Sequence, residues 1–323
     1  MVLIIAILNV VRATMAFTLV NVEPLTVPVL DFSRLNCSTS RPLAVEDIGR
    51  ACKKMGCFQV VNHGIQGSII SSALEAAAGF FELPSVKAGL ASEDVRKPVR
   101  FSEGFMHNNN KKRALLKLYA HPLSHWIQFW PLTPVHYREK MGNYAMEVRR
   151  VALQLMDAIL ESLGLGKAYM GEKLDDGIQF IATNSYSNIS GSDSTVGLAP
   201  HTDHGFITIL IQDCDGLQIL NDIDGNGKSW KKVLARVPDS LHVHIGDHLE
   251  VLSNGRYKSL VHRAVINSHN RISISSTHGL SMDEKVATPK ELVDEQWPKK
   301  YKESSFHDFL DYIRAKDTTG GKS

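Results

Sequence analysis

The sequence predicts an α+β protein in which a sandwich, jelly roll or barrel of short strands is flanked by helices. Three observations support this fold class. From about residue 177 onward, short apolar or alternating runs follow one another and are separated by turn signals. A long amphipathic helical pattern precedes these runs, and helical patterns return after about residue 281. The strands do not alternate with helices in βαβ order, which argues against a parallel sheet.

The first region, residues 27–130, mixes both kinds of element. Residues 27–32 and 56–61 are rich in apolar and β-branched side chains and predict strands. Residues 45–55 and 68–81 carry helical periodicity, and the second helix should end before Pro84. We therefore expect an N-terminal α/β region.

The next region, residues 134–164, predicts one long helix. Apolar residues recur there every three or four positions, which places them on one face, and Gly164 supplies the stop. A helix packed on a sheet is the common use of such a face, so we expect a scaffold. The residues on this face are Tyr137, Met141, Tyr144, Val148, Val151, Leu155 and Ile159.

Residues 177–280 predict the strand-rich core. The predicted strands are 178–181, 206–211, 216–220, 241–245 and 271–275. Gly-containing pairs, among them Gly246-Asp247, predict the turns between them. The tail, residues 281–323, predicts helices opening near Thr288 and over 304–313.

Composition limits the partners and the compartment. The chain has 323 residues, of which 43% are hydrophobic and 22% charged, and a formal net charge of +2. This balance gives no electrostatic reason to expect nucleic acid or an anionic membrane as a partner. Four irregularly spaced cysteines do not make a disulfide scaffold, so we expect a cytoplasmic protein. We also expect a monomer. The apolar residues 1–20 leave a targeting segment open as an alternative.

A group of metal-ligating side chains is the strongest chemical signal. His201 and Asp203 are two positions apart, so in an extended segment they point to the same side. His262, in a second strand-like run beyond a turn, is the best third ligand. Two histidines and one carboxylate on one face are typical of non-haem Fe(II) oxygenases. The same three residues could equally hold a catalytic zinc.

A co-substrate site distinguishes these alternatives. Arg271 and Ser273 share one face of a strand, nine residues beyond His262. A guanidinium donates two parallel hydrogen bonds to a carboxylate, and a serine hydroxyl can add a third. A dicarboxylate that is anchored here at one end could chelate iron with its other end.

The order of these motifs resembles that of the plant 2-oxoglutarate- and Fe(II)-dependent dioxygenases, in the branch of flavonol synthase, flavanone 3-hydroxylase and the gibberellin oxidases. The resemblance covers residues 27–313. The motifs that carry it are Val27-Pro-Val-Leu-Asp31, Gly56-Cys-Phe-Gln-Val-Val-Asn-His-Gly-Ile65, Phe80-Phe-Glu-Leu-Pro84, His201-Thr-Asp203, Gly216-Leu-Gln-Ile219, Gly246-Asp247, Ser253-Asn-Gly255, Lys258-Ser259, His262-Arg263 and Arg271-Ile-Ser273.

The resemblance implies a distorted double-stranded β-helix, a cupin-like jelly roll, with helices packed outside. It also implies Fe(II) as the metal, 2-oxoglutarate and O2 as co-substrates and ascorbate as the reductant. The implied iron ligands are His201, Asp203 and His262, and the implied 2-oxoglutarate-binding residues are Arg271, Ser273, Asn184 and Tyr186.

The implied reaction is the hydroxylation or desaturation of a small plant specialised metabolite or hormone, with release of succinate and CO2. A flavonoid or other phenolic is the first expectation for the substrate, and a gibberellin- or auxin-type hormone is the alternative. Two further alternatives stay open. One is an oxidase of the same fold that uses ascorbate in place of 2-oxoglutarate, and the other is a catalytically weakened binding protein.

The sequence departs from the family pattern at several positions. The prolines that usually follow the tyrosine are missing after Tyr186, which should loosen that loop. Lys112-Arg113-Ala114 stands where Trp-Arg-Asp is usual, which alters the wall on the substrate side. His242 and His244 replace an apolar residue and an asparagine, and they could resemble a metal pair, although no carboxylate partners them. His248 lies in a polar context and is expected to be solvated.

By resemblance, the substrate wall comes from residues 101–105, from the turn near Phe206 and from the residues just beyond Ser273. An aromatic residue at the position of Thr277 often stacks on flavonoid rings in relatives, and here it is replaced. The candidate substrate contacts are Phe101, Phe105, Phe206, Thr277 and His278.

Overall fold

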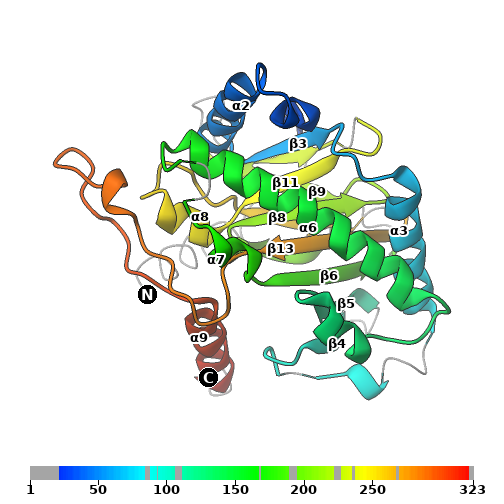
Figure 1. Ribbon diagram of the computed structural model, residues 1–323. Helices are drawn as coiled ribbons and strands as arrows, with labels where there is room; N and C mark the ends of the chain where they lie inside the picture. The colour runs from blue at the N-terminus through cyan, green and yellow to red at the C-terminus, as the bar shows by residue number, and fades with distance from the viewer. Residues whose placement is uncertain are drawn as a thin grey trace.

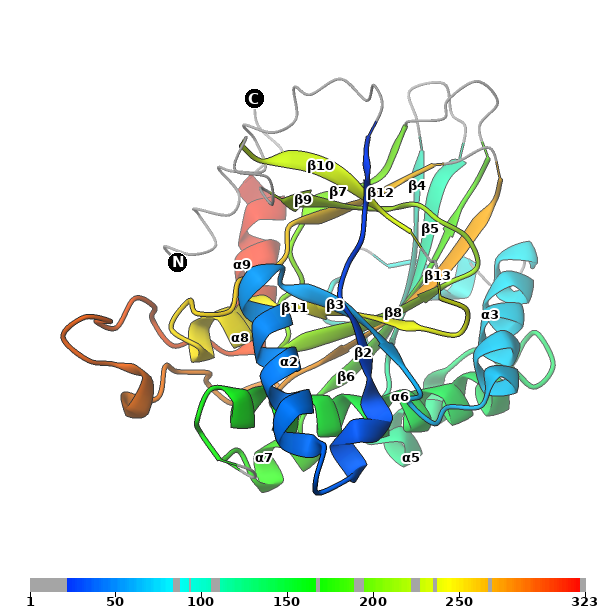
Figure 2. The same ribbon diagram turned by 90° about the horizontal axis from the view of Figure 1, so that it is seen from above.

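Two β-sheets face each other in the computed structural model (Figures 1 and 2). The structure describes residues 22–83, 88–92, 94–105, 111–166, 169–188, 195–221, 227–234, 237–266 and 269–319. The larger sheet contains, in spatial order, β2 (Val29–Asp31), β3 (Cys57–Val61), β11 (Leu241–Ile245), β8 (Ile207–Gln212), β13 (Arg271–His278), β6 (Gln179–Tyr186), β5 (Lys111–Tyr119) and β4 (Val99–Phe105). The smaller sheet contains β1 (Pro24–Leu25), β10 (Ser229–Val233), β9 (Leu217–Asn221), β12 (His262–Val265) and β7 (Val196–His201).

Helices cover the face of the larger sheet that is turned away from the smaller sheet (Figure 2). They are α2 (Arg41–Lys54), α3 (Gly67–Glu82) and α6 (Tyr137–Ser162). Shorter helices are α5 (Leu123–Trp126), α7 (Glu172–Asp175) and α8 (Asp247–Leu252), and α9 (Phe306–Thr319) follows near the C-terminus. The antiparallel order β11-β8-β13-β6-β5-β4, opposed by β9-β12-β7, is a jelly roll with flanking helices. The predicted fold class is confirmed.

Helix α6 is the main scaffold, as its periodicity predicts. It crosses the larger sheet diagonally (Figure 1), and each of the seven apolar residues on the predicted face is at most 1% exposed. Burying a large apolar side chain contributes about 1.5–3 kcal/mol. This face therefore fixes α6 against the sheet and makes the sheet a rigid support for side chains on its other face.

Strand alternation separates the two faces of the sheet. On β5, Ala114, Leu116 and Leu118 are completely buried in the hydrophobic core beneath the helices. The residues between them therefore point toward the smaller sheet. On β6 and β13, Asn184 and Ser273 pair directly across the ladder, so they lie on this same inner face.

Several elements differ from the prediction. Strands β4, β5 and β10 were not predicted, because polar and basic residues interrupt their apolar runs. Gly246-Asp247 was predicted to form a turn between two strands. In the structure, helix α8 begins at Asp247, and its six residues are all buried. The helix predicted near Thr288 is wrong, since only a 3-10 turn, Lys290–Leu292, forms after Pro289.

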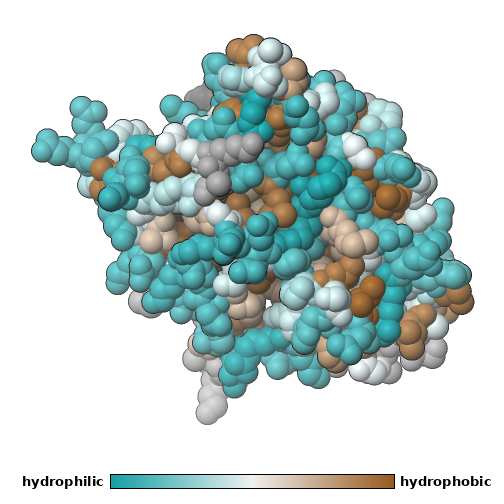
Figure 3. Space-filling model, viewed as in Figure 1, coloured by the Kyte–Doolittle hydropathy of each residue, from teal (hydrophilic) through white to brown (hydrophobic). Residues whose placement is uncertain are grey.

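The outer surface over α6 is largely hydrophilic, with separate small hydrophobic spots (Figure 3). Within the described ranges, no helix combines the length and the apolar character that a membrane span requires. The apolar residues 1–20, considered above as a targeting segment, lie outside the described residues.

Candidate functional site

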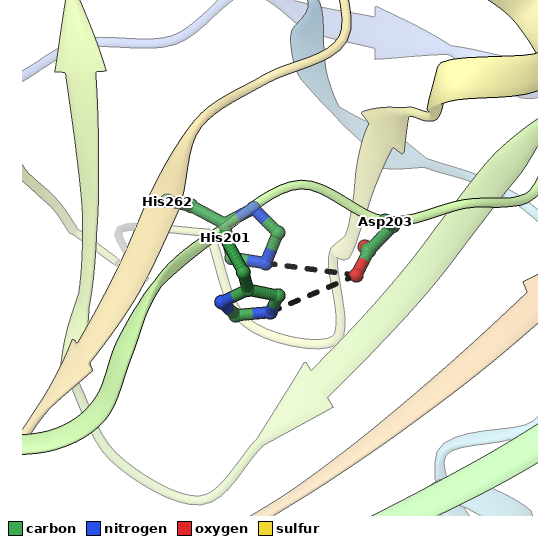
Figure 4. A group of neighbouring side chains, drawn as sticks. All are labelled: His201, Asp203 and His262. Atoms are coloured by element: carbon green, nitrogen blue, oxygen red, sulfur yellow. Dashed lines mark ion pairs between the residues drawn. The ribbon is translucent and has the colours of Figure 1, made fainter. Parts of the chain in front are cut away.

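Three side chains converge between the two sheets. His201 is the last residue of β7 and His262 is the first residue of β12, and the two residues are paired in the antiparallel ladder. Asp203 follows two residues after His201. Its Oδ1 atom lies 3.8 Å from Nε2 of His201 and 3.9 Å from Nε2 of His262 (Figure 4). Among the described residues, these three form the only group of histidine, cysteine and acidic side chains close enough to hold one metal ion.

The backbone fixes which nitrogen each ring offers. Nδ1 of His201 lies 2.9 Å from the carbonyl oxygen of Ala199, and Nδ1 of His262 lies 3.0 Å from that of Leu260. A carbonyl oxygen only accepts, so each Nδ1 carries the proton and donates it. Each Nε2 is therefore left with a free lone pair that faces Asp203, which is the tautomer a metal requires.

The electrostatics of the group also suit a cation. Burial, with a further contribution from the neighbouring His262 ring, lowers the pKa of His201 to about 4. Burial acts to raise the pKa of the Asp203 carboxyl, but the His262, His201 and His244 rings outweigh it, and the net pKa lies below its ordinary value. At neutral pH the group therefore offers a neutral imidazole and a carboxylate as ligands.

A cavity of about 50 Å³ adjoins the three side chains. Polar residues from β6 and β13 form one wall, namely Asn184, Tyr186, Arg271, Ser273 and Ser275. Apolar residues from the facing strands, including Leu198, Leu217 and Ala264, form the opposite wall. The cavity thus connects the histidine–aspartate group with the predicted co-substrate residues.

Two nitrogen atoms of the Arg271 guanidinium donate hydrogen bonds within the protein, and the third has no partner. Its Nη2 donates to Oε1 of Gln212 at 2.6 Å, and its Nε donates to the carbonyl oxygen of Cys214 at 3.2 Å. Its Nη1 is buried without a hydrogen-bond partner, and so is Nε2 of Gln212. Two buried donors without partners are costly unless an acceptor binds. An anionic ligand such as a carboxylate fits this arrangement.

Asn184 and Tyr186 are also brought to this wall. Tyr186 pairs with Arg271 across the β6–β13 ladder, and its ring centroid lies 5.0 Å from Cζ of Arg271. Arg113, on β5, donates from Nε and Nη2 to Oδ1 of Asn184, at 2.8 and 2.6 Å. Because the oxygen of the Asn184 amide is occupied by these donors, its NH2 group is the part left to donate to a ligand.

The residues present therefore fit a metal and an organic anion together. Two imidazoles and one carboxylate leave the remaining coordination positions open, the arrangement used by non-haem iron and also by catalytic zinc. The partnerless Nη1 donor of Arg271 adds a carboxylate site in the same cavity.

The structure does not bring the candidate substrate contacts to the cavity in the way that it brings the metal-binding and carboxylate-binding residues. Phe101 and Phe206 are 4% and 1% exposed and belong to the hydrophobic core, and neither lines the cavity. Thr277 pairs its hydroxyl with that of Thr208 at 3.1 Å, and the buried His278 pairs its Nε2 with Ser276. Phe105 ends β4, and its side chain lies outside the described part of the structure. These positions favour packing roles.

Other residues have roles that differ from the sequence prediction. His248 is 2% exposed, so the expectation that it is solvated is wrong, because α8 is buried over its whole length. Its ring lies 4.2 Å from that of His204, which stacks on Phe309 of α9. His244 lines the cavity, with its ring centroid 4.8 Å from that of His262. Sequence reasoning noted Arg113 only as part of an altered segment and missed its contact with Asn184.

Two family profiles match the chain. The profile described as the 2OG-Fe(II) oxygenase superfamily matches residues 177–279. The profile described as the N-terminal part of the non-haem dioxygenase in morphine synthesis matches residues 27–131. The residues His201, Asp203 and His262 therefore lie inside the first profile, and Arg113 lies inside the second.

Relatives from Oryza sativa subsp. japonica are similar over most of the chain. The protein named 2-oxoglutarate-dependent dioxygenase 21, chloroplastic, is 53% identical over 296 residues, which is 90% of this chain and 88% of the relative. Flavanone 3-dioxygenase 3 is 50% identical over 297 residues, which is 91% of this chain and 90% of the relative.

Solved structures share the fold at lower identity. The rice dioxygenase for auxin oxidation superposes with a TM-score of 0.75 at 25% identity, covering 92% of this chain and 97% of its own. JOX2, solved in complex with 2OG, Fe and JA, superposes with a TM-score of 0.77 at 25% identity, covering 95% of this chain and 93% of its own.

Proposed function

The chain belongs to the 2OG-Fe(II) oxygenase superfamily, and from this premise we propose that it hydroxylates or desaturates a small plant specialised metabolite or hormone. The protein is an Fe(II)- and 2-oxoglutarate-dependent dioxygenase by its membership. The substrate and the residue roles are our proposal.

One observation carries the proposal: a histidine–aspartate group with two free Nε2 atoms shares its cavity with an arginine that keeps one buried donor unused. We assign Fe(II) to His201, Asp203 and His262. We assign the distal carboxylate of 2-oxoglutarate to Arg271 and Ser273, which share one face of β13. The same three ligands could hold zinc, and the membership in the 2OG-Fe(II) oxygenase superfamily favours Fe(II).

When bound, Fe(II) and 2-oxoglutarate supply the oxidising chemistry, in which O2 is reduced and succinate and CO2 are released. The chain's own residues prepare the site for this chemistry. The carbonyl oxygens of Ala199 and Leu260 hold the histidine rings so that Nε2 faces the metal position. Asn184, with its amide oxygen held by Arg113, presents its NH2 group to the co-substrate. The apolar facing wall limits the entry of water.

For the substrate, a flavonoid or another phenolic compound is the first class to test, because a flavanone 3-dioxygenase is among the half-identical relatives. A hormone acid is the second candidate. It is supported by the likeness to a dioxygenase for auxin oxidation and to a structure that contains JA. We assign no nucleic-acid or membrane partner. Cytoplasmic location and a monomeric state stay predictions, and the name of one relative includes the word chloroplastic.

The experiment that tests this function measures succinate release. The protein is loaded with Fe(II) and 2-oxoglutarate without O2, mixed with flavonoids, gibberellins, auxins and coumarins, and then exposed to O2 with ascorbate present. We expect succinate formation that depends on 2-oxoglutarate and is stimulated by at least one compound. Oxidation that proceeds equally well without 2-oxoglutarate would support an ascorbate-dependent oxidase instead. Binding without any succinate would support a binding protein.

A further inference from the structure

A group of three basic side chains lies on the inner face of strands β4 and β5, next to the co-substrate cavity. Arg100 on β4 pairs directly with Lys117 on β5. Arg113 is four residues before Lys117 on β5, so strand alternation places it on the same face. We call Arg100, Arg113 and Lys117 the cationic strip.

No carboxylate in the described part of the chain forms an ion pair with the strip. The hydrogen bonds of Arg113 go to the neutral amide of Asn184. Nε of Arg100 is buried without a hydrogen-bond partner. Three cations thus share one face without a compensating anion among the described residues.

This arrangement is unfavourable by itself. Like charges directly opposite each other on neighbouring strands are destabilising. Burial, with a further contribution from the charge of Arg100, lowers the pKa of Lys117 to about 8. Burial is also the main cause that lowers the pKa of Arg113, the neighbouring Tyr186 hydroxyl acts against it, and Arg100 acts in the same direction as burial. An anion bound at the strip would relieve both the repulsion and the unused donor.

The strip lies beside the polar wall of the cavity, and its three residues are not among those that line the cavity. In the β5–β6 ladder, Lys117 is opposite Ala182, and Ala182 is opposite Ser275, which lines the cavity. Ala182 contributes only a methyl group to this inner face, so no bulky side chain separates Lys117 from the cavity in this row. Arg113 is opposite Tyr186, which also lines the cavity.

An aromatic ring lies beside the strip. Nζ of Lys117 lies 4.5 Å from the centroid of the Phe180 ring, and that ring lies 4.7 Å from Phe306 of α9. Phe180 is opposite Tyr119 of β5, so strand alternation places it on the same inner face as Lys117. An aromatic molecule held at the strip would therefore have this ring beside it.

We propose that Arg100 and Lys117 bind the carboxylate of the substrate, so that the substrate is an aromatic carboxylic acid. This inference rests on the proposed function and narrows it. Arg271, on β13, holds the carboxylate of the co-substrate, so the strip is a separate anion site for the second molecule. The guanidinium of Arg100 can donate two parallel hydrogen bonds to a carboxylate, and the ammonium of Lys117 adds a point charge beside it.

The test compares acids with their neutral amides. Indole-3-acetate and indole-3-acetamide, and cinnamate and cinnamamide, are titrated by calorimetry at pH 7 into protein loaded with Fe(II) and 2-oxoglutarate without O2. Naringenin is included as a neutral flavonoid. For at least one pair, we expect the acid to bind roughly tenfold or more tightly than its amide, the size expected for hydrogen bonds to charged groups.

The variants Lys117→Met and Arg100→Gln should each weaken binding of the acid roughly tenfold and leave binding of the amide unchanged. Lys140→Met is the matched control, because Lys140 lies on α6 across the larger sheet and pairs with Glu75. This control variant should change the affinity for neither the acid nor the amide. Both strip variants should still bind 2-oxoglutarate like the unaltered protein, which separates this inference from the proposed function.

Two outcomes would overturn the inference. The first is equal affinity for acids and amides, including the case in which no acid binds measurably at millimolar concentration. The second is an acid-to-amide ratio that stays unchanged in Lys117→Met. A failure of the unaltered protein to bind 2-oxoglutarate would instead refute the proposed function.

Discussion

The proposed active site has two halves, the cavity and the cationic strip beside it, which differ in how their polar groups are supported. In the half formed by β7, β12, β6 and β13, protein neighbours hold most of each functional side chain. His201 and His262 are fixed through Nδ1, and Arg271 is fixed through Nε and Nη2, so one atom of each is left for a ligand. In the half formed by β4 and β5, the charges of Arg100 and Lys117 face each other without an anion among the described residues.

On the proposed assignments, the first half determines the reaction and the second half determines which substrates are preferred. The first half is preorganised by the fold before any ligand arrives, so it can serve one invariant co-substrate and one metal. The second half becomes favourable only when a ligand supplies the missing charge. A change in the first half should therefore abolish turnover on every substrate, whereas a change in the second should alter the preference among substrates.

Replacing a metal-ligating side chain should have the largest effect, because it should abolish iron binding and turnover. His201→Ala deletes one of the two imidazoles, and changes in the groups that merely support metal ligands already cost 10–100-fold. We expect at least about a hundredfold loss of succinate release and a loss of bound iron, measured as iron per chain after anaerobic loading. His242→Asn is the control, since His242 is buried but does not belong to the metal-binding group. Normal iron content in His201→Ala would contradict the assignment.

Removing the co-substrate anchor should have the next largest effect. Arg271→Gln loses the charge and the buried Nη1 donor, and we expect the Kd for 2-oxoglutarate to rise roughly 10–100-fold. Arg271→Lys keeps the charge without the bidentate geometry, so its Kd for 2-oxoglutarate should lie between those of the unaltered protein and Arg271→Gln. Calorimetric titration with 2-oxoglutarate measures both variants. Iron content should stay normal in both, and a 2-oxoglutarate affinity that is unchanged in Arg271→Gln would mean that the anion binds elsewhere.

The first half could be predicted from the sequence because its signals are local. His201 and Asp203 share a face through their spacing alone, and so do Arg271 and Ser273. The periodicity that predicted the apolar face of α6 is also a local signal, and all seven residues of that face are buried. The prediction of His262 as the third ligand required the assumption that a second strand lies beside the first. The ladder pairs His262 with His201 as this assumption requires.

The second half could not be predicted, because it depends on which strands lie side by side. Arg100 and Lys117 are seventeen positions apart, and only the register of β4 on β5 makes them opposite. Their strands were not predicted either, since basic residues break the apolar pattern of β4 and β5. The burial of His248 was missed for a related reason, because three-dimensional packing buries α8 despite its polar residues.

Arg113 joins the two halves, and changing it should have a moderate effect. Arg113→Gln removes the two hydrogen bonds that hold the Asn184 oxygen, each worth about 1 kcal/mol, so the amide can turn. We expect the KM for 2-oxoglutarate to rise roughly three- to tenfold while kcat at saturating 2-oxoglutarate changes little. Arg113→Lys should recover part of the loss. If Arg113→Gln lowered kcat and left the KM unchanged, a role in positioning Asn184 would be excluded.

The smallest predicted effect concerns the pH dependence of stability, and it comes from Lys117. Its pKa in the folded protein is about 8, mainly through burial and then through Arg100, whereas an unfolded lysine has a pKa near ~10.4. The unfolded chain therefore binds the extra proton between about pH 8 and pH 10, and the folded protein becomes relatively more stable as pH rises through this window.

Below pH 8 the charge of Lys117 costs stability, so Lys117→Met should melt at a higher temperature than the unaltered protein at pH 7. With the partial exposure of Lys117 taken into account, we expect a difference of about 1 kcal/mol, or roughly 2–4 °C. Arg100 and Arg113 stay charged over this range, so the difference should shrink between pH 8 and pH 10 as Lys117 alone loses its proton. Thermal melts of both proteins at pH 7 and pH 10 measure it. A difference that is constant or grows with pH would mean that Lys117 already has a compensating partner, and the two halves of the proposed site would then be supported in the same way.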